Sequence, residues 1–266
     1  MKLLIKRKRL YPKGSKLRAI FRLTLLFFIF APILFAIKWV ISLFVSERLD
    51  RNIRRVLLHR WAKLFVFFCG IKIEIVGNPP KLPCFIVANH ISYVDTLVLH
   101  YATKCIFVSR GDVEHWPLIG VIAKAIYIIF IDRSNRLDTK RVNEEIKHAL
   151  TMGDGVAVFA ESRISCGKDV QPFRSALLSA PIELNLPVYY ATITYETLPG
   201  YNTPPVSYFV AWWRPEPFFY HLFRLLSYKG FKSRVIFGDK PLYESDRKQL
   251  AQKLWEKVKE NFTPVS

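Results

Sequence analysis

The segment FIVANHISYVDTLVL, residues 85–99, places one histidine and one aspartate five positions apart. His90 can act as a general base near neutral pH, because an unperturbed histidine side chain changes its charge at about pH 6.5. The carboxylate of Asp95 could accept the second ring N–H, hold one tautomer and stabilise the imidazolium. The alternative is a satisfied, half-buried polar cluster at a strand end. The pair alone does not decide between these interpretations, because bare matches of this kind are common.

Further polar residues follow other apolar, strand-like segments. The segment IIFIDR, residues 128–133, ends in Arg133, and VFAESRIS, residues 158–165, carries Glu161, Ser162 and Arg163. Polar side chains that recur at the ends of successive apolar strands can converge on one cleft. The sequence therefore predicts that these residues share a site with His90.

The elements that would position these residues alternate between strands and helices. The clearest helix is at the C-terminus, where Ser245 reads as an N-cap and Leu250, Leu254 and Val258 form one face. The pattern predicts strands at 71–77, 84–89, 105–109, 126–132, 155–160, 187–195, 207–213 and 233–237, and helices at 93–102, 138–152, 173–185 and 217–227. We expect an α/β fold with a mixed central sheet flanked by helices. His90 would then lie at a strand-to-helix junction, where α/β sheets commonly bind ligands.

The N-terminal 70 residues have a different character. Residues 1–22 carry nine Lys or Arg and no acid, and two apolar runs follow at 23–45 and 55–70. Pro32 would kink the first run, and Lys38 is unfavourable near a bilayer centre. Because basic residues flank both runs, we expect a helical hairpin dipped into one leaflet, with Trp39 and Trp61 near the interface. The predicted division is a basic N-terminus with a membrane-associated helical hairpin at 1–70 and an α/β domain at 71–266.

The composition limits the classes of molecule that the chain is expected to bind. The chain of 266 residues has a net charge of +19, which favours acidic partners. Beside an apolar hairpin, anionic membrane lipid is the better interpretation, and no nucleic-acid-binding motif is present. The four cysteines form no CxxC pair, so we expect no metal site and a reducing, cytosolic environment.

The motifs, in their order, resemble those of the glycerolipid acyltransferases, the group that contains 1-acylglycerol-3-phosphate acyltransferase. NHISYVD resembles the NHxxxxD block, and FIDR resembles the second block. FAESRIS stands where the third block, FPEGTRS, belongs, and PFRSALL continues it. LPV, residues 186–188, contains the proline of the fourth block. The resemblance runs from about residue 71 to 260, and the family's membrane-embedded helical hairpin fits the N-terminal runs.

This resemblance implies a reaction and roles for the residues. His90 would be the general base and Asp95 its orienting carboxylate, within hydrogen-bonding reach of each other. Arg133 would bind the acceptor phosphate, and Glu161, Ser162 and Arg163 of the third block would help to bind the substrate. Acyl-CoA or acyl carrier protein would serve as co-substrate, with no metal or other cofactor. The enzyme would act on a lysophospholipid at the cytoplasmic face of a membrane, the inner membrane if the source is bacterial.

The third block departs from the family pattern. Ala160 and Ser162 replace a Pro–Gly pair, Arg163 replaces Thr, and Ile164 replaces Arg. Glycine allows a closer approach of backbone to ligand than serine does, so the departure bears on the acceptor more than on the reaction. Lysophosphatidate is the default acceptor, and another lysophospholipid or a lyso-aminolipid is the alternative. A non-catalytic lipid-binding relative also stays open, whereas a hydrolase is disfavoured because no GxSxG motif is present.

Overall fold

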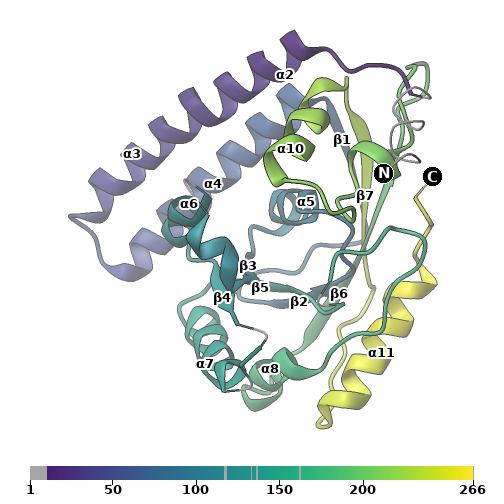
Figure 1. Cartoon of the computed structure of the whole chain (residues 1–266). Coiled ribbons are helices and arrows are strands. Elements are labelled where there is room, and N and C mark those ends of the chain that lie inside the picture. The colour runs from purple at the N-terminus through teal and green to yellow at the C-terminus, as the bar shows by residue number, and fades with distance from the viewer. Residues whose placement is uncertain (1–10, 117–118, 133, 136, 162, 266) are drawn as a thin grey trace.

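A computed structural model describes residues 11–116, 119–132, 134–135, 137–161 and 163–265. Their centre is a mixed seven-stranded sheet of order β1-β7-β6-β2-β5-β3-β4 (Figure 1). The strands are β1 (Ile71–Val76), β2 (Phe85–Ala88), β3 (Ile106–Arg110), β4 (Ile129–Ile131), β5 (Val156–Phe159), β6 (Val188–Glu196) and β7 (Phe231–Phe237). β6 and β7 pair antiparallel and all other neighbours pair parallel. The expected mixed α/β sheet is confirmed.

Helices cover both faces of this sheet. In β2, Ile86 and Ala88 belong to one core cluster, whereas Phe85 and Val87 belong to the other. This two-sided burial explains why the strand is continuously apolar. The helices after β1 are α5 (Val94–Thr103), α6 (Ile119–Ala125), α7 (Asp138–Thr151), α8 (Ser179–Glu183), α9 (Val206–Phe209), α10 (Phe218–Ser227) and α11 (Arg247–Glu260), with short 3-10 turns at Gly111–His115 and Ala176–Leu178.

Two local predictions were wrong, and a third was correct only in part. The predicted strand at 207–213 is instead the short helix α9 followed by irregular chain, because a short apolar run fits a buried helix as well as a strand. The N-cap of α11 is Asp246 and not Ser245, since the Asp246 carboxylate accepts from the backbone N–H groups of Lys248 and Gln249, each at 2.8 Å. The predicted helix at 173–185 is shorter and divided, with a 3-10 turn leading into α8.

The N-terminal chain forms one long helix that turns back into a second. α2 (Lys16–Leu23), a π-helical segment (Thr24–Phe30) and α3 (Ala31–Ser42) are continuous, and α4 (Glu47–Cys69) runs alongside (Figure 1). The π-helical segment precedes Pro32, which has no N–H to donate within a regular α-helix. Within the described ranges, the helix Lys16–Ser42 is the one long and apolar enough to cross a membrane.

Several charges of the hairpin point inward. Arg51 Nη1 and Arg54 Nη2 contact the buried carboxylate of Asp154 at 2.8 and 2.7 Å, just before β5. Lys38 Nζ lies 3.4 Å from Asp50 Oδ2 across the turn. These cations are therefore neutralised within the protein, and Arg51 and Arg54 fasten α4 to the amino end of β5.

Candidate active site

His90 and Asp95 meet at the carboxyl end of β2. The Nδ1 atom of His90 lies 2.7 Å from Asp95 Oδ2, which confirms the predicted hydrogen-bonding reach. His90 follows β2, and Asp95 occupies the first turn of α5, so the strand-to-helix junction sets their separation. The Asp95 side chain is fully buried, whereas that of His90 is 16% exposed. The buried carboxylate thus faces one nitrogen of an imidazole that still reaches the surface.

Three further donors hold the Asp95 carboxylate. Its Oδ2 atom accepts from the backbone N–H groups of Ile91 at 2.6 Å and Ser92 at 2.8 Å. Its Oδ1 atom accepts from the hydroxyl group of Tyr195 at 2.6 Å. Every partner of this carboxylate other than the His90 ring is an N–H or O–H donor, so its oxygens act as acceptors. The N–H at His90 Nδ1 is accordingly the donor to Asp95 Oδ2. This leaves Nε2 as the nitrogen available to a substrate, and no described residue hydrogen-bonds it.

The plane of the His90 ring is set by stacking. The ring lies on Phe159 at the end of β5, with centroids 4.2 Å apart and planes inclined by 8°. Phe159 in turn lies parallel to Phe107 of β3, with an angle of 5° and a centroid distance of 5.7 Å. A ring held on one face and at Nδ1 has little freedom to rotate, so the direction of Nε2 is fixed before any substrate binds.

The side chain of Asn89 secures the chain as it leaves β2. Its Nδ2 donates to the carbonyl of Ile193 at 2.9 Å, and its Oδ1 accepts from the Ile193 N–H at 2.7 Å. The amide therefore extends the β2–β6 ladder beyond Ala88, where the main chain turns away. This reciprocal pair places His90 next to the sheet with little freedom.

Glu161 lies in the same site but does not present its carboxylate to open space. Its Oε1 accepts from the backbone N–H of His90 at 2.6 Å, and its Oε2 accepts from that of Gln171 at 2.9 Å. Burial raises the pKa of the Glu161 carboxyl to about 7, although both hydrogen bonds act in the opposite direction. Glu161 thus joins the loop after β5 to the backbone of His90.

The remaining predicted site residues are placed only in part. Arg133 and Ser162 lie outside the described residues. Arg163 is exposed, and it has no hydrogen-bond or ion-pair partner in the part of the chain that the structure describes. The structure therefore brings together His90, Asp95 and Glu161.

The proline of the fourth block is remote from this group. Pro187 precedes β6, whose first residue, Val188, pairs with Phe85 at the amino end of β2. His90 follows the opposite end of β2. The strand that follows the fourth block, β6, reaches the site with its far end, where Ile193 and Tyr195 lie.

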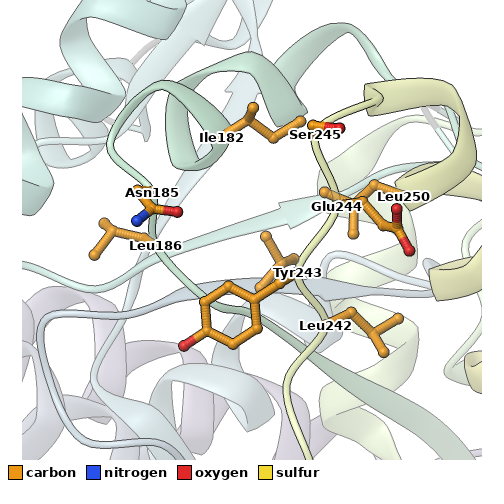
Figure 2. Close-up of a pocket in the computed structure, with 9 residues that line it drawn as sticks. Ile182, Asn185, Leu186, Leu242, Tyr243, Glu244, Ser245 and Leu250 are labelled. Atoms are coloured by element: carbon orange, nitrogen blue, oxygen red, sulfur yellow. The ribbon is translucent and has the colours of Figure 1, made fainter.

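A surface pocket of about 350 Å³ also lies at the amino end of β6 (Figure 2). Its lining includes Asn185 and Leu186, before β6, and Tyr243 and Glu244, before α11. No predicted site residue lines it, and the β2–β6 register puts it at the other end of the sheet from His90. It is therefore separate from the candidate active site.

Sequence reasoning missed two members of the site. Tyr195 and Phe159 were interpreted only as strand residues, although they contact Asp95 and His90. A tyrosine at a buried strand position is a signal by itself, since a buried phenol needs a hydrogen-bond partner. The identity of that partner is not encoded in the neighbouring residues.

Known proteins resemble the chain along most of its length. A family model described as Acyltransferase matches residues 71–194. The lyso-ornithine lipid O-acyltransferase of Brucella abortus is 30% identical over 214 residues, which cover 74% of this chain and 77% of that protein. The enzyme of the same name from Rhodobacter capsulatus is 29% identical over 196 residues, covering 71% of this chain and 69% of that protein.

Two further similarities concern the other acceptor and the fold. The 1-acyl-sn-glycerol-3-phosphate acyltransferase of Neisseria gonorrhoeae is 29% identical over 136 residues, which cover 50% of this chain and 53% of that protein. The alignment thus spans about half the length of this relative. Among solved structures, the 1-acyl-sn-glycerophosphate (LPA) acyltransferase PlsC from Thermotoga maritima matches with a TM-score of 0.66. It is 18% identical and covers 91% of this chain and 95% of that one, so it shows the same fold.

Proposed function

Since the chain belongs to the glycerolipid acyltransferase family, we propose that it transfers a fatty acyl group from a thioester to the hydroxyl group of a lysolipid. The observation that carries this proposal is the hydrogen bond of 2.7 Å between His90 Nδ1 and the buried carboxylate of Asp95. A free hydroxyl is a poor nucleophile at neutral pH, so a base is required. The arrangement supplies a base of one tautomer, with Nε2 left for the substrate.

The proposed reaction needs no covalent enzyme intermediate. The acceptor hydroxyl gives its proton to His90 Nε2 while its oxygen attacks the thioester carbonyl. The imidazolium is stabilised by Asp95, as in other His–Asp pairs. The tetrahedral intermediate then collapses, the C–S bond breaks, and His90 returns the proton to the departing sulfur. Because the thioester is already activated, we propose no metal or cofactor beyond the donor itself.

Lysophosphatidate is the acceptor that we propose first. The resemblance of FIDR to the family's second block supports a phosphate contact by Arg133, since a guanidinium can bind phosphate through two hydrogen bonds. A lyso-ornithine lipid is the second candidate. The relatives named for that acceptor align with 74% and 71% of this chain, and the departures in the third block support a changed acceptor.

The long helix Lys16–Ser42 and the lipid-synthesis names of the relatives indicate association with a membrane. We propose that residues 23–70 form a hairpin in one leaflet and that the α/β domain that follows acts at its cytoplasmic face. Large apolar side chains along the helix, such as Leu17, Phe28 and Trp39, are exposed and would contact lipid. The net charge of +19 suits anionic lipid and either donor, acyl-CoA or acyl carrier protein.

The test is an acyl-transfer assay on the full-length protein in lipid vesicles. Radiolabelled acyl-CoA or acyl carrier protein would be offered with lysophosphatidate, lyso-ornithine lipid or a neutral lysolipid. We expect labelled diacyl product with at least one acceptor and none from the His90→Ala protein. If the wild type binds these lipids but transfers no acyl group from either donor, it is a non-catalytic relative and the proposal fails.

A further inference from the structure

A tyrosine one hundred residues away completes the environment of Asp95. Tyr195 lies on β6, and its hydroxyl donates to Asp95 Oδ1 at 2.6 Å. Both side chains are buried, and the Tyr195 ring packs edge-on against Phe231 of β7, with centroids 5.6 Å apart. The tyrosine is thus held by the antiparallel β6–β7 pair, a part of the sheet that contributes no residue to the His–Asp motif.

The bond has a defined direction. Burial and the nearby Asp95 charge hold the pKa of the Tyr195 phenol well above its usual range. The phenol therefore stays protonated and is the donor of the hydrogen bond to Asp95. The bond occupies Oδ1, whereas His90 Nδ1 contacts Oδ2. Hence Tyr195 anchors one oxygen of the carboxylate to the sheet, whereas the other oxygen faces the imidazole and the backbone N–H groups of Ile91 and Ser92.

We propose that Tyr195 is a positioning residue of the acyl-transfer reaction, which sets the orientation and the effective charge of Asp95 toward His90. Two physical effects follow from its hydrogen bond. It restrains rotation of the carboxylate, which keeps Oδ2 directed at Nδ1. It also withdraws negative charge from the carboxylate, so Asp95 stabilises the imidazolium less than a carboxylate without this bond would. This inference rests on the proposed function.

The second effect separates positioning from a purely structural role. Without the Tyr195 hydroxyl, the carboxylate would favour protonated His90 more strongly. A general base must be neutral to accept a proton, so the acid limb of the kcat/KM profile should move to higher pH in Tyr195→Phe. We expect a shift of about half a unit or more, together with a decrease in kcat of about tenfold. A hydroxyl that only stabilised the fold would lower the melting temperature without moving the acid limb.

The experiment measures kcat/KM against pH, kcat and thermal unfolding for the wild type and Tyr195→Phe in vesicles. The matched control is Tyr190→Phe, which alters another buried tyrosine of β6 that lies in the other core cluster. The control should leave the acid limb in place. In an Asp95→Asn background, Tyr195→Phe should change the residual rate by less than twofold, because both substitutions act on one unit. Full additivity there, or an acid limb that does not rise in Tyr195→Phe, would overturn the inference.

A failure of the proposed function would look different. If the wild type transfers no acyl group to any lysolipid, no profile exists to compare. An NMR titration of the His90 imidazole still tests Tyr195 in that case. Its midpoint should be higher in Tyr195→Phe than in the wild type, and equal midpoints would refute the coupling regardless of activity.

Discussion

His90 and Glu161 are joined at the backbone: the N–H of His90 donates to Glu161 Oε1 at 2.6 Å. The residue that supplies the proposed base is thereby fastened to the loop after β5, which carries the third block. The same carboxyl also accepts from the N–H of Gln171, so one side chain sets the positions of two segments. We propose that Glu161 shapes the site in this way, whether or not the acceptor also contacts it.

The first prediction uses the titration of this carboxyl. Its pKa is raised from 4.5 to about 7, mainly by burial. The unfolded chain therefore loses the Glu161 proton at lower pH than the folded protein does. The contribution of this group to stability is present below about pH 4.5 and is lost as pH rises to about 7, by up to about 3 kcal/mol.

The side chain introduced by Glu161→Gln does not titrate, so this variant should not lose stability in this way as pH rises. The measurement is the unfolding free energy of both proteins in detergent between pH 4.5 and 7.5. Relative to the variant, the wild type should become less stable as pH rises. Parallel curves would show that folding does not raise the pKa of the Glu161 carboxyl.

The second prediction concerns the His–Asp pair. His90→Ala removes the base, and Asp95→Asn removes the carboxylate that fixes its tautomer, so each should lower kcat by about a thousandfold or more. Vesicle binding should remain at the wild-type level in both variants. His148→Ala is a suitable control, because this histidine is exposed on α7. Near-normal turnover by purified His90→Ala would rule out the mechanism.

The third prediction concerns the contact between the hairpin and the domain. Asp154→Asn should destabilise the protein by about 3 kcal/mol, because it leaves the buried Arg54 without an anion and leaves Arg51 with only the half-exposed Glu47. Asp112→Asn provides the comparison, since the ion pair of Asp112 with Arg110 is exposed. It should cost less than about 1 kcal/mol. Equal losses in chemical unfolding would show that the buried pair does not hold α4 in place.

The fourth prediction addresses the acceptor. If lysophosphatidate is the substrate, Arg133→Ala should raise its KM about thirtyfold, the effect of losing about 2 kcal/mol of charge-assisted bonding. The KM of the thioester donor should change little, and Arg133→Lys should restore part of the affinity. Arg163→Thr should also raise the acceptor KM, with a non-additive double variant, if both cations bind one phosphate.

Two outcomes would overturn these assignments. An unchanged acceptor KM in Arg163→Thr would make Arg163 a solvated residue without a substrate role. Acylation of lyso-ornithine lipid with no activity toward lysophosphatidate would remove the phosphate role of Arg133. The acyl-transfer role of His90 would be unaffected by either result.

The sequence by itself determined the features that depend on neighbouring residues. His90 and Asp95 lie within one strand-to-helix junction, so a short motif was sufficient to predict their contact. The continuous apolar run of β2 indicated burial on both faces, and the alternation of strands and helices indicated the α/β class. The type of a short element was less reliable, because an apolar run such as 207–213 fits a strand as well as a helix.

Only the tertiary structure decided which distant residues meet. The order of the sheet puts β6 beside β2, and this adjacency brings Tyr195 to Asp95 across one hundred residues. The packing of α4 likewise buries Arg51 and Arg54 against Asp154, a contact across about one hundred residues that the sequence alone did not predict. The residue type and its neighbours indicate that a buried hydroxyl or charged group needs a hydrogen-bond or ion-pair partner. Which partner it finds depends on strand order and helix packing, and these are properties of the whole fold.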